Sequence, residues 1–440
     1  MIVGGGFGGF FAARRLARKL RSGEAEITVV SDTDGMLYQP LLPDVAVGAI
    51  DPRIASVPLR QALGEVKLLR GRALAVDIEA REVSVQALGG EFRIGYEYLL
   101  LAPGGVTRTV DVPSLARVAI GFKTTAEALY LRELVLSRLE AASTEANELH
   151  RQAGTTFIVV GAGYAGIELT AQMARLTRNL LPSFPTLSES GTRWLLLNHS
   201  TTVMPELGTG LGESTLKLLA RRGVEVLLET TVKAVSGELV TLTDDSVVPC
   251  ATIVWCAGVA ANPLVASTGL PLVAGRLEVT PFLSVGDHPE VFAVGDAAAV
   301  PDITKDGQPP PLCPPTAQHA MRQGPAAARN IVASLRGHAP KPYRHRDLGL
   351  VVDLGGSHAV ARPLGVPLSG WPAKILTRGY HLFALPSTRR RLSAIASWAL
   401  AGRRPNDVSF GLLDLHQALA GPREHAALPA PASTSTEHDG

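Results

Sequence analysis

The chain has 440 residues, of which 46% are hydrophobic and 19% charged, and its 42 basic and 40 acidic residues give a net charge of +2. This length suits two or three domains, and the balanced charge gives no reason to expect a nucleic-acid partner. With three cysteines, which cannot form a disulfide framework, and no stretch near the roughly 20 apolar residues that span a bilayer, we expect a protein of a reducing cytoplasm, soluble or peripheral to a membrane.

The N-terminal segment predicts a strand, a glycine-rich loop and a helix. Apolar residues 2–3 precede three glycines at GxGxxG spacing, which are Gly4, Gly6 and Gly9. Apolar side chains then recur at helical spacing up to Gly23, the predicted helix end, and a second strand is predicted at residues 27–31. We expect no signal peptide. Because strands usually have about five or six residues, we also expect the native start to lie upstream of Met1.

A second unit of the same kind lies in mid-chain. A predicted strand at residues 156–160 precedes the glycines Gly161, Gly163 and Gly166, a periodic helix, and a further strand at residues 194–198. Between the two units we predict a strand near residue 98 and a charged helix at residues 127–142. Strands that alternate with helices are typical of parallel sheets, so the predicted fold class is α/β with two Rossmann-like dinucleotide-binding domains.

The C-terminal third contains shorter elements. Strands are predicted at residues 252–258 and 291–296, and a Pro-rich passage at residues 309–315 leads into a helix that ends near residue 335. Residues from 422 onward lack periodicity and are predicted to be a disordered tail.

Each glycine triplet has the spacing of a dinucleotide-binding loop. The first glycine allows the turn, the second lets the backbone approach the pyrophosphate, and the third lets helix and strand pack closely. The usual ribose-binding acid is replaced by Ser31 in the first unit and by Asn198 in the second. These side chains can still hydrogen-bond a hydroxyl, and no arginine is placed to bind a 2′-phosphate. We therefore expect NADH rather than NADPH.

Together these segments resemble the type II NADH dehydrogenases, which are FAD-dependent NADH:quinone oxidoreductases. The resemblance implies that the first loop binds FAD and the second binds NADH. Residues 280–296 are similar to the family's second FAD motif, so Asp296 would bind the ribityl chain. Residues 37–48 are similar to the stretch beside the flavin, which places Gln39 and Pro40 near the isoalloxazine.

The resemblance also implies an organisation into five parts. These are an FAD-binding domain at 1–112 and 266–365, an NADH-binding domain at 113–265, C-terminal amphipathic helices at 366–421 and the tail at 422–440.

The acceptor is implied by residues 314–324, which resemble the family's quinone-site pattern AQxAxQ. Gln318 matches, whereas Arg322 occupies the second glutamine position and Gln323 follows it. Glu168 matches a family glutamate that links nicotinamide, flavin and quinone. The alternatives are that Glu168 only complements the positive end of a helix and that Gln318 is an ordinary exposed or capping residue.

A quinone acceptor, menaquinone or ubiquinone, implies contact with the cytoplasmic face of the cell membrane. Residues 371–385 place Lys374, Thr377, Arg378 and His381 on one helical face and mostly apolar side chains on the other. Arginines at 389–391 and a second apolar stretch follow, a pattern typical of interfacial helices that favour anionic lipids. The alternative is that the apolar face packs on the body of the protein or on a second subunit, so a homodimer stays open.

Other functions fit the residues less well. A sulfide:quinone oxidoreductase needs redox cysteines beside the flavin, but none precedes Cys250, and no CxxxxC pair of the disulfide reductases is present. A soluble NAD(P)H:ferredoxin-type reductase or a low-turnover flavin redox sensor remains as the alternative. No His/Cys/Asp cluster has metal spacing. His199 and His319 are therefore predicted to be polar residues of the surface or core, and Cys256 a packing residue.

Overall fold

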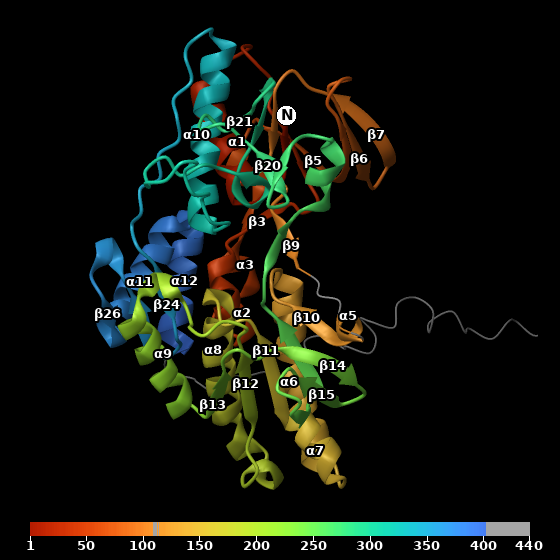
Figure 1. The fold of residues 1–440 in the computed structure, drawn as a ribbon, viewed down its shortest axis with the longest axis vertical. Helices are drawn as coiled ribbons and strands as arrows, with labels where there is room; N and C mark the ends of the chain where they lie inside the picture. Colours follow the sequence, from red (N-terminus) through yellow and green to blue (C-terminus); the bar gives the residue numbers. More distant parts are fainter. Residues whose placement is uncertain (109–111, 113, 402–440) are drawn as a thin grey trace, which may run out of the picture.

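The computed structural model describes residues 1–108, 112 and 114–401 (Figure 1). Its largest sheet has eight strands in the order β21-β22-β8-β1-β2-β5-β6-β7. Their bounds are β21 Ser284–Val285, β22 His288–Ala293, β8 Leu99–Leu101, β1 Ile2–Val3, β2 Thr28–Ser31, β5 Lys67–Asp77, β6 Glu82–Ala87 and β7 Gly90–Gly95. The strands from β22 to β5 pair in parallel, whereas β5, β6 and β7 form an antiparallel extension.

The second large sheet has five parallel strands in the order β10-β17-β11-β12-β13. Their bounds are β10 Ala119–Gly121, β17 Thr252–Trp255, β11 Thr156–Val160, β12 Arg193–Leu197 and β13 Val224–Leu227. All five residues of β11 are buried, as expected for a strand covered on both faces. The predicted α/β class and parallel sheets are confirmed.

Helices cover both sheets. α1 (Phe7–Lys19) packs against α10 (Ala317–Leu335), and a Cβ atom on Gly324 would lie 2.3 Å from the carbonyl oxygen of Gly8. Only a glycine at that point lets the two helices approach so closely. α6 (Thr125–Thr144) begins with a Thr124–Glu127 capping box, and α8 (Tyr164–Leu180) follows the second glycine loop.

The two sheets occupy opposite ends of the molecule and are joined by a two-stranded ribbon (Figure 1). The ribbon consists of β9 (Gly105–Thr107) and β18 (Val259–Ala261) in antiparallel pairing. Each strand lies a few residues after a strand of a large sheet, β8 and β17 respectively. The chain therefore crosses from one sheet to the other and back at one place.

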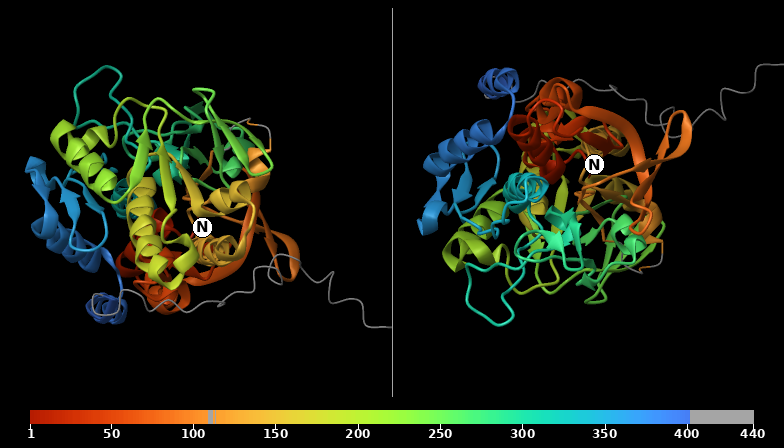
Figure 2. Two further views of the ribbon diagram at one scale, coloured as in Figure 1. Left: turned by 90° about the horizontal axis from the view of Figure 1, so that it is seen from below. Right: turned by 90° about the horizontal axis from the view of Figure 1, so that it is seen from above.

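The C-terminal elements form a separate layer at one side of the molecule, drawn in blue (Figures 1 and 2). A three-stranded sheet of β24 (Val351–Asp353), β25 (Ala359–Ala361) and β26 (Leu368–Ser369) supports α11 (Gly370–Ala384), and α12 (Thr388–Ala401) follows. Within the described ranges, no helix combines the length and apolar character that crossing a membrane requires. The predicted tail at 422–440 lies outside the described residues.

One local prediction differs from the structure. α1 ends at Lys19 rather than near Gly23, because Leu20 adopts an extended conformation and Gly23 belongs to the following turn. The two predicted faces of α11 are present: Lys374, Thr377 and His381 are buried against the protein, while Ile375 and Phe383 are exposed. The polar face of this helix therefore points inward and its apolar face points outward.

Candidate functional site

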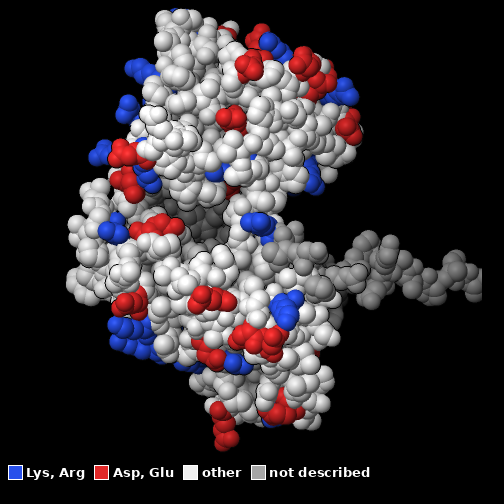
Figure 3. Space-filling view, in the orientation of Figure 1, with Lys and Arg blue, Asp and Glu red and all other residues white. Residues whose placement is uncertain are grey.

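A cavity of about 690 Å³ lies between the two large sheets and receives residues from both glycine loops. It is visible as a deep hollow between the upper and lower halves of the molecule in Figure 3. The carboxyl ends of parallel strands in an open α/β sheet are where such folds bind ligands. Here the ends of β1, β2, β8, β11 and β17 all supply loops to the same region.

The first loop has the geometry of a dinucleotide-binding turn. Gly4 has a φ of +104°, and a Cβ atom on Gly9 would lie 1.8 Å from the Gly4 carbonyl oxygen, so both positions require glycine. A Cβ atom on Gly6 would meet no protein atom within 4 Å, because Gly6 faces the cavity. The loop ends at the N-terminus of α1, whose free N–H groups favour a phosphate.

The second loop repeats this geometry. Gly161 has a φ of +105°, a Cβ atom on Gly166 would lie 1.9 Å from the Gly161 carbonyl oxygen, and Gly163 faces open space. Both Gly163 and Gly166 line the cavity. Two turns with the geometry of pyrophosphate-binding loops therefore face one shared cavity, an arrangement that fits two dinucleotides.

The two positions that replace the ribose acids differ in structure. Ser31 ends β2, is buried, and lines the cavity beside the exposed Asp32. The side chain of Asn198 instead hydrogen-bonds to backbone groups. Its oxygen accepts from the Ala162 N–H, and its nitrogen donates to the Ser200 and Thr202 carbonyls. Asn198 therefore stabilises the second glycine loop and does not line the cavity.

Asp296, just after β22, lines the cavity, as do Gln39 and Pro40. Burial raises the pKa of the Asp296 carboxyl, while Lys123 and Arg276 oppose that shift. Lys123 also lines the cavity, and burial lowers the pKa of its ammonium. A carboxylate beside a glycine turn and an open helix N-terminus fits the ribityl and pyrophosphate groups of FAD.

The two glutamines near the start of α10 have different positions. Gln318 lines the cavity and donates its amide N–H to the Gly349 carbonyl at 3.0 Å. Gln323 is 1% exposed, and its oxygen accepts from the N–H of Gly295 at 2.7 Å, next to Asp296. Arg322 donates to the Gln318 carbonyl and does not line the cavity. Gln318 can therefore touch a ligand, whereas Gln323 holds the loop that carries Asp296.

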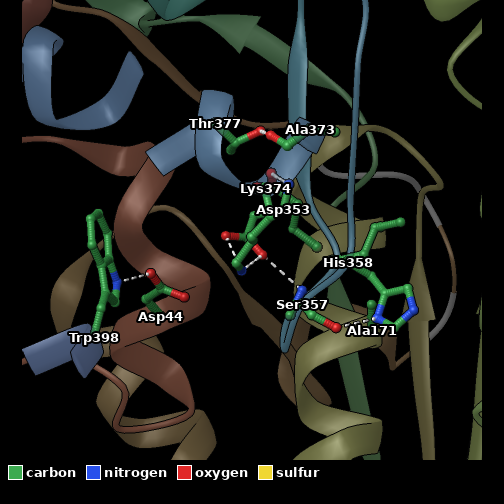
Figure 4. Close-up of polar contacts among 12 residues, drawn as sticks. Asp44, Ala171, Asp353, Ser357, His358, Ala373, Lys374, Thr377 and Trp398 are labelled. Carbon is green, nitrogen blue, oxygen red and sulfur yellow. Dashed lines mark hydrogen bonds and ion pairs between the residues drawn. The ribbon is translucent and has the colours of Figure 1, made fainter. Parts of the chain in front are cut away.

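Glu168, near the start of α8, lines the cavity and joins a buried group of charged residues. Its Oε1 accepts from the Asp353 backbone N–H at 2.6 Å, and the Asp353 carboxylate is paired with Lys374 of α11, with 2.6 Å between Nζ and Oδ2 (Figure 4). Burial raises the pKa of Glu168 well above its usual value, and the nearby Asp353 and Asp44 add to that shift. Glu168 therefore holds a proton more readily than an exposed glutamate does.

Two further buried contacts join the C-terminal helices to the cavity. The Tyr38 hydroxyl lies 3.1 Å from His381 Nδ1 of α11, and the Trp398 indole N–H of α12 donates to Asp44 at 2.8 Å (Figure 4 shows the second pair). Both Tyr38 and His381 line the cavity. Burial lowers the pKa of His381 to about 4, so its ring is neutral near pH 7.

The sequence prediction missed several of these groups. Asp44 and Asp353 each stand alone among apolar residues in the printed sequence, and an acid in such surroundings is a signal of a buried partner. Lys374 and His381 were assigned to a polar face without partners, because the pairing partners lie far away in the chain.

The histidine and cysteine predictions have mixed outcomes. His319 is a buried residue whose ring stacks on His345 at 3.8 Å between centroids. Cys256 packs against the hydrophobic core as predicted, but it is only partly buried and also lines the cavity. No group of three His, Cys, Asp or Glu side chains that could hold a metal exists in the described part of the chain.

Comparisons with known proteins identify the family. Residues 1–324 match the model of the pyridine nucleotide-disulphide oxidoreductase family. The type II NADH:quinone oxidoreductase NdhA of Mycobacterium tuberculosis is 32% identical, over 91% of this chain and 86% of that protein. The chain belongs to the type II NADH:quinone oxidoreductases. The demethylphylloquinone reductase NdbB of Synechocystis is 30% identical, over 90% of this chain and 94% of that protein.

A solved structure agrees at the level of the fold. The NDH2 of Plasmodium falciparum in complex with NADH superposes with a TM-score of 0.83, over 91% of this chain and 98% of that one, at 17% identity. The family prediction is confirmed, and the ferredoxin-type or sensor alternative is not favoured. The enzyme is therefore a flavoprotein oxidoreductase that uses FAD and NADH and reduces a quinone.

Proposed function

We propose that this enzyme binds FAD at the first glycine loop and NADH at the second, and that a quinone reaches the shared cavity from a membrane beside α11 and α12. The cavity lined by both loops is the observation that carries the proposal. When bound, FAD supplies the redox chemistry, since it accepts a hydride from NADH and passes two electrons to a quinone. The protein contributes position, proximity and electrostatics.

The domain boundaries follow the sheets in this proposal. The eight-stranded sheet, with residues 1–112 and 266–365, is the FAD-binding domain, and the five-stranded sheet, within residues 113–265, is the NADH-binding domain. Gly4, Gly6 and Gly9 form the turn at the FAD pyrophosphate, with Ser31 at its ribose. Gly161, Gly163 and Gly166 do the same for NADH, and Asn198 acts by stabilising that loop.

Residues around the centre of the cavity have distinct proposed roles. Asp296 binds the ribityl chain, and Gln39 and Pro40 lie against the isoalloxazine. Gln318 contacts the quinone, whereas Gln323 acts indirectly because its oxygen holds the Gly295 N–H. Glu168 holds a proton beside the nicotinamide and flavin, which is supported by its burial and by the direction of its pKa shift.

The outward face of the C-terminal helices supports membrane contact. Six large apolar side chains on α11 and α12 are between 49% and 79% exposed: Trp371, Ile375, Phe383, Leu392, Ile395 and Leu400. We call this set the docking face. Large exposed apolar patches on soluble proteins commonly mark membrane or protein contacts. Arg389 is exposed at the start of α12, where a guanidinium favours anionic headgroups.

The proposed side of the membrane is the cytoplasmic one, where NADH is found, and the quinone is menaquinone or ubiquinone. A homodimer that covers the docking face is the second arrangement that the exposed apolar residues would fit. Sedimentation with vesicles and the oligomeric state in solution distinguish the two arrangements.

The docking face can be tested without disturbing the buried face of α11. Ile375→Glu and Phe383→Glu place charges on two exposed positions of α11. Each is expected to reduce binding to anionic vesicles about tenfold or more, because a carboxylate is costly to place in the apolar part of a bilayer. Leu88→Glu is the matched control, since Leu88 is 98% exposed in the turn between β6 and β7. Equal vesicle binding by all three variants would contradict membrane docking through this face.

A further inference from the structure

One side of the cavity is formed by a segment that belongs to neither large sheet. This wall segment, residues 37–46, runs from the end of β3 (Gly35–Leu37) through the turn η1 (Gln39–Leu41) to α2 (Leu42–Ala46). The residues of the wall segment that line the cavity are Leu37, Tyr38, Gln39, Pro40, Leu42 and Pro43. The segment also carries the two residues proposed to lie beside the isoalloxazine, so its position shapes the reactive end of the cavity.

The wall segment contains little regular structure of its own. β3 pairs only with the three-residue strand β4 (Ser56–Pro58), and α2 has five residues, too few for a helix to be stable alone. On its inner side α2 packs against α6 and α8 of the five-stranded sheet. From the C-terminal layer, α12 bonds to α2 itself, and α11 bonds to Tyr38, which precedes η1.

Each of these two helices reaches the wall segment through one hydrogen bond. His381 of α11 meets the Tyr38 hydroxyl at 3.1 Å, and Trp398 of α12 donates to the Asp44 carboxylate at 2.8 Å. The two contacts join residues separated by 343 and 354 positions in the chain. They hold the wall segment near both of its ends.

The four side chains are all buried, with exposures of 1% for Tyr38, 5% for His381, 6% for Asp44 and 7% for Trp398. Among the described residues, no other hydrogen-bond donor reaches the Asp44 carboxylate. The Arg378 guanidinium lies over the face of the Trp398 ring, 4.5 Å from its centroid. The indole is therefore held both at its face and at the N–H that donates to Asp44.

These contacts do more than bury surface. Two apolar side chains would bury as much area without the cost of placing a carboxylate in the interior. A hydrogen bond adds direction, so that α2 has one defined position relative to α12. The same two helices carry the docking face, so the surface proposed to meet the membrane is joined directly to the cavity.

We propose that Trp398 and His381 are positioning residues, which hold the wall segment at Asp44 and Tyr38 so that α11 and α12 complete the quinone side of the cavity. This inference rests on the proposed function, since it takes the acceptor to be a quinone that enters beside these helices. NADH is proposed to bind at the second glycine loop, to which neither Trp398 nor His381 is hydrogen-bonded. We therefore expect loss of either contact to weaken quinone binding much more than it slows hydride transfer from NADH.

The test uses Trp398→Phe, which removes the donor and keeps an aromatic ring. Trp194→Phe is the matched control, because Trp194 is also buried and donates one indole hydrogen bond, but to Thr177 at 3.0 Å, a residue outside the wall segment. Asp44→Asn retains an oxygen that accepts from the indole, so it separates the hydrogen bond from the charge. Tyr38→Phe removes the second contact independently.

Four measurements on the full-length holoenzyme are compared. They are amide hydrogen exchange of residues 37–46, the visible spectrum of the bound flavin, the KM for a short-chain quinone, and the rate of flavin reduction by NADH. In Trp398→Phe, exchange in the wall segment and the KM for quinone are each expected to rise about tenfold, with a shifted flavin band, while flavin reduction stays within about twofold. Asp44→Asn and Trp194→Phe are expected to match the wild type in exchange and KM.

The outcomes distinguish a failure of the proposed function from a failure of the positioning role. If the wild type passes electrons from NADH to ferricyanide but to no quinone, the proposed function fails. If the wild type reduces quinone and Trp398→Phe matches it in exchange, spectrum and KM, only the positioning role is overturned. An Asp44→Asn variant as impaired as Trp398→Phe would also overturn it, because the charge would then be what matters. Should Trp398→Phe fail to bind FAD, Tyr38→Phe provides the same comparison, and unchanged values there overturn the inference.

Discussion

The buried pair of Lys374 and Asp353 provides a quantitative test of the C-terminal layer. Both side chains are about one-tenth exposed, at 9% and 10%, and the carboxylates of Glu168 and Asp44 lie close by. Lys374→Met removes the cation and keeps the length of the side chain. Loss of one partner from a buried pair costs about 3–5 kcal/mol, because the remaining charge has no compensation. We expect a loss of that size in the free energy of unfolding.

An exposed pair within the same chain is the control. Lys233 and Asp245 form an ion pair with side-chain exposures of 56% and 75%. Since exposed pairs contribute about 0–1 kcal/mol, Lys233→Met is expected to change stability by no more than that. The double variant Lys374→Met, Asp353→Asn removes both charges and is expected to recover part of the loss.

Urea unfolding of the holoenzyme, followed by circular dichroism and by flavin fluorescence, measures these differences. The two signals are compared because a cofactor-binding protein with two sheets need not unfold in one step. Equal destabilisation by Lys374→Met and Lys233→Met would refute the interpretation that a buried ion pair holds α11 to β24.

Three further predictions concern the second glycine loop and two buried ionisable residues. Gly166→Ala places a Cβ atom 1.9 Å from a backbone oxygen and is expected to lower the melting temperature. The Cβ atom of Gly163→Ala meets no protein atom, so this variant is expected to raise only the KM for NADH. The reverse pattern would contradict the assigned geometry. Burial raises the pKa of Glu168, so the folded protein holds a proton that the unfolded chain releases, and stability is lost as the pH rises above the ordinary glutamate value. Glu168→Gln is expected to lose less stability than the wild type between about pH 5 and pH 8 in thermal melts, and parallel curves would contradict this. Burial, with His345 and Arg322, lowers the pKa of His319 to about 4, so stability is lost as the pH falls below 6.5. As the pH falls from 6.5 to about 4, the His319→Gln protein should lose about 1–3 kcal/mol less stability than the wild type. An equal loss of stability in both proteins would refute the assignment.

Local patterns predicted the two nucleotide-binding units well. β11 spans Thr156–Val160 as expected, and both glycine loops have the positive φ and close approach that the GxGxxG spacing implies. These features depend on residues that lie near one another in the chain, so periodicity and glycine spacing are sufficient to find them.

Long-range pairing was not predictable in the same way. The orientation of α11 depends on Asp353, a residue of β24 whose carboxylate pairs with Lys374 only after the chain has folded. Periodicity identified two faces on that helix, but it did not reveal that the polar face is the buried one. The same reason applies to Trp398 and Asp44, whose contact joins residues 354 positions apart.

The central claim is tested most directly by rapid mixing of the purified yellow holoenzyme with NADH, followed by addition of a quinone. The account predicts that NADH bleaches the flavin absorbance, and that menadione or a menaquinone analogue restores it and sustains NADH oxidation over many turnovers. Bleaching by NADH that ferredoxin reverses and quinone does not would contradict the account.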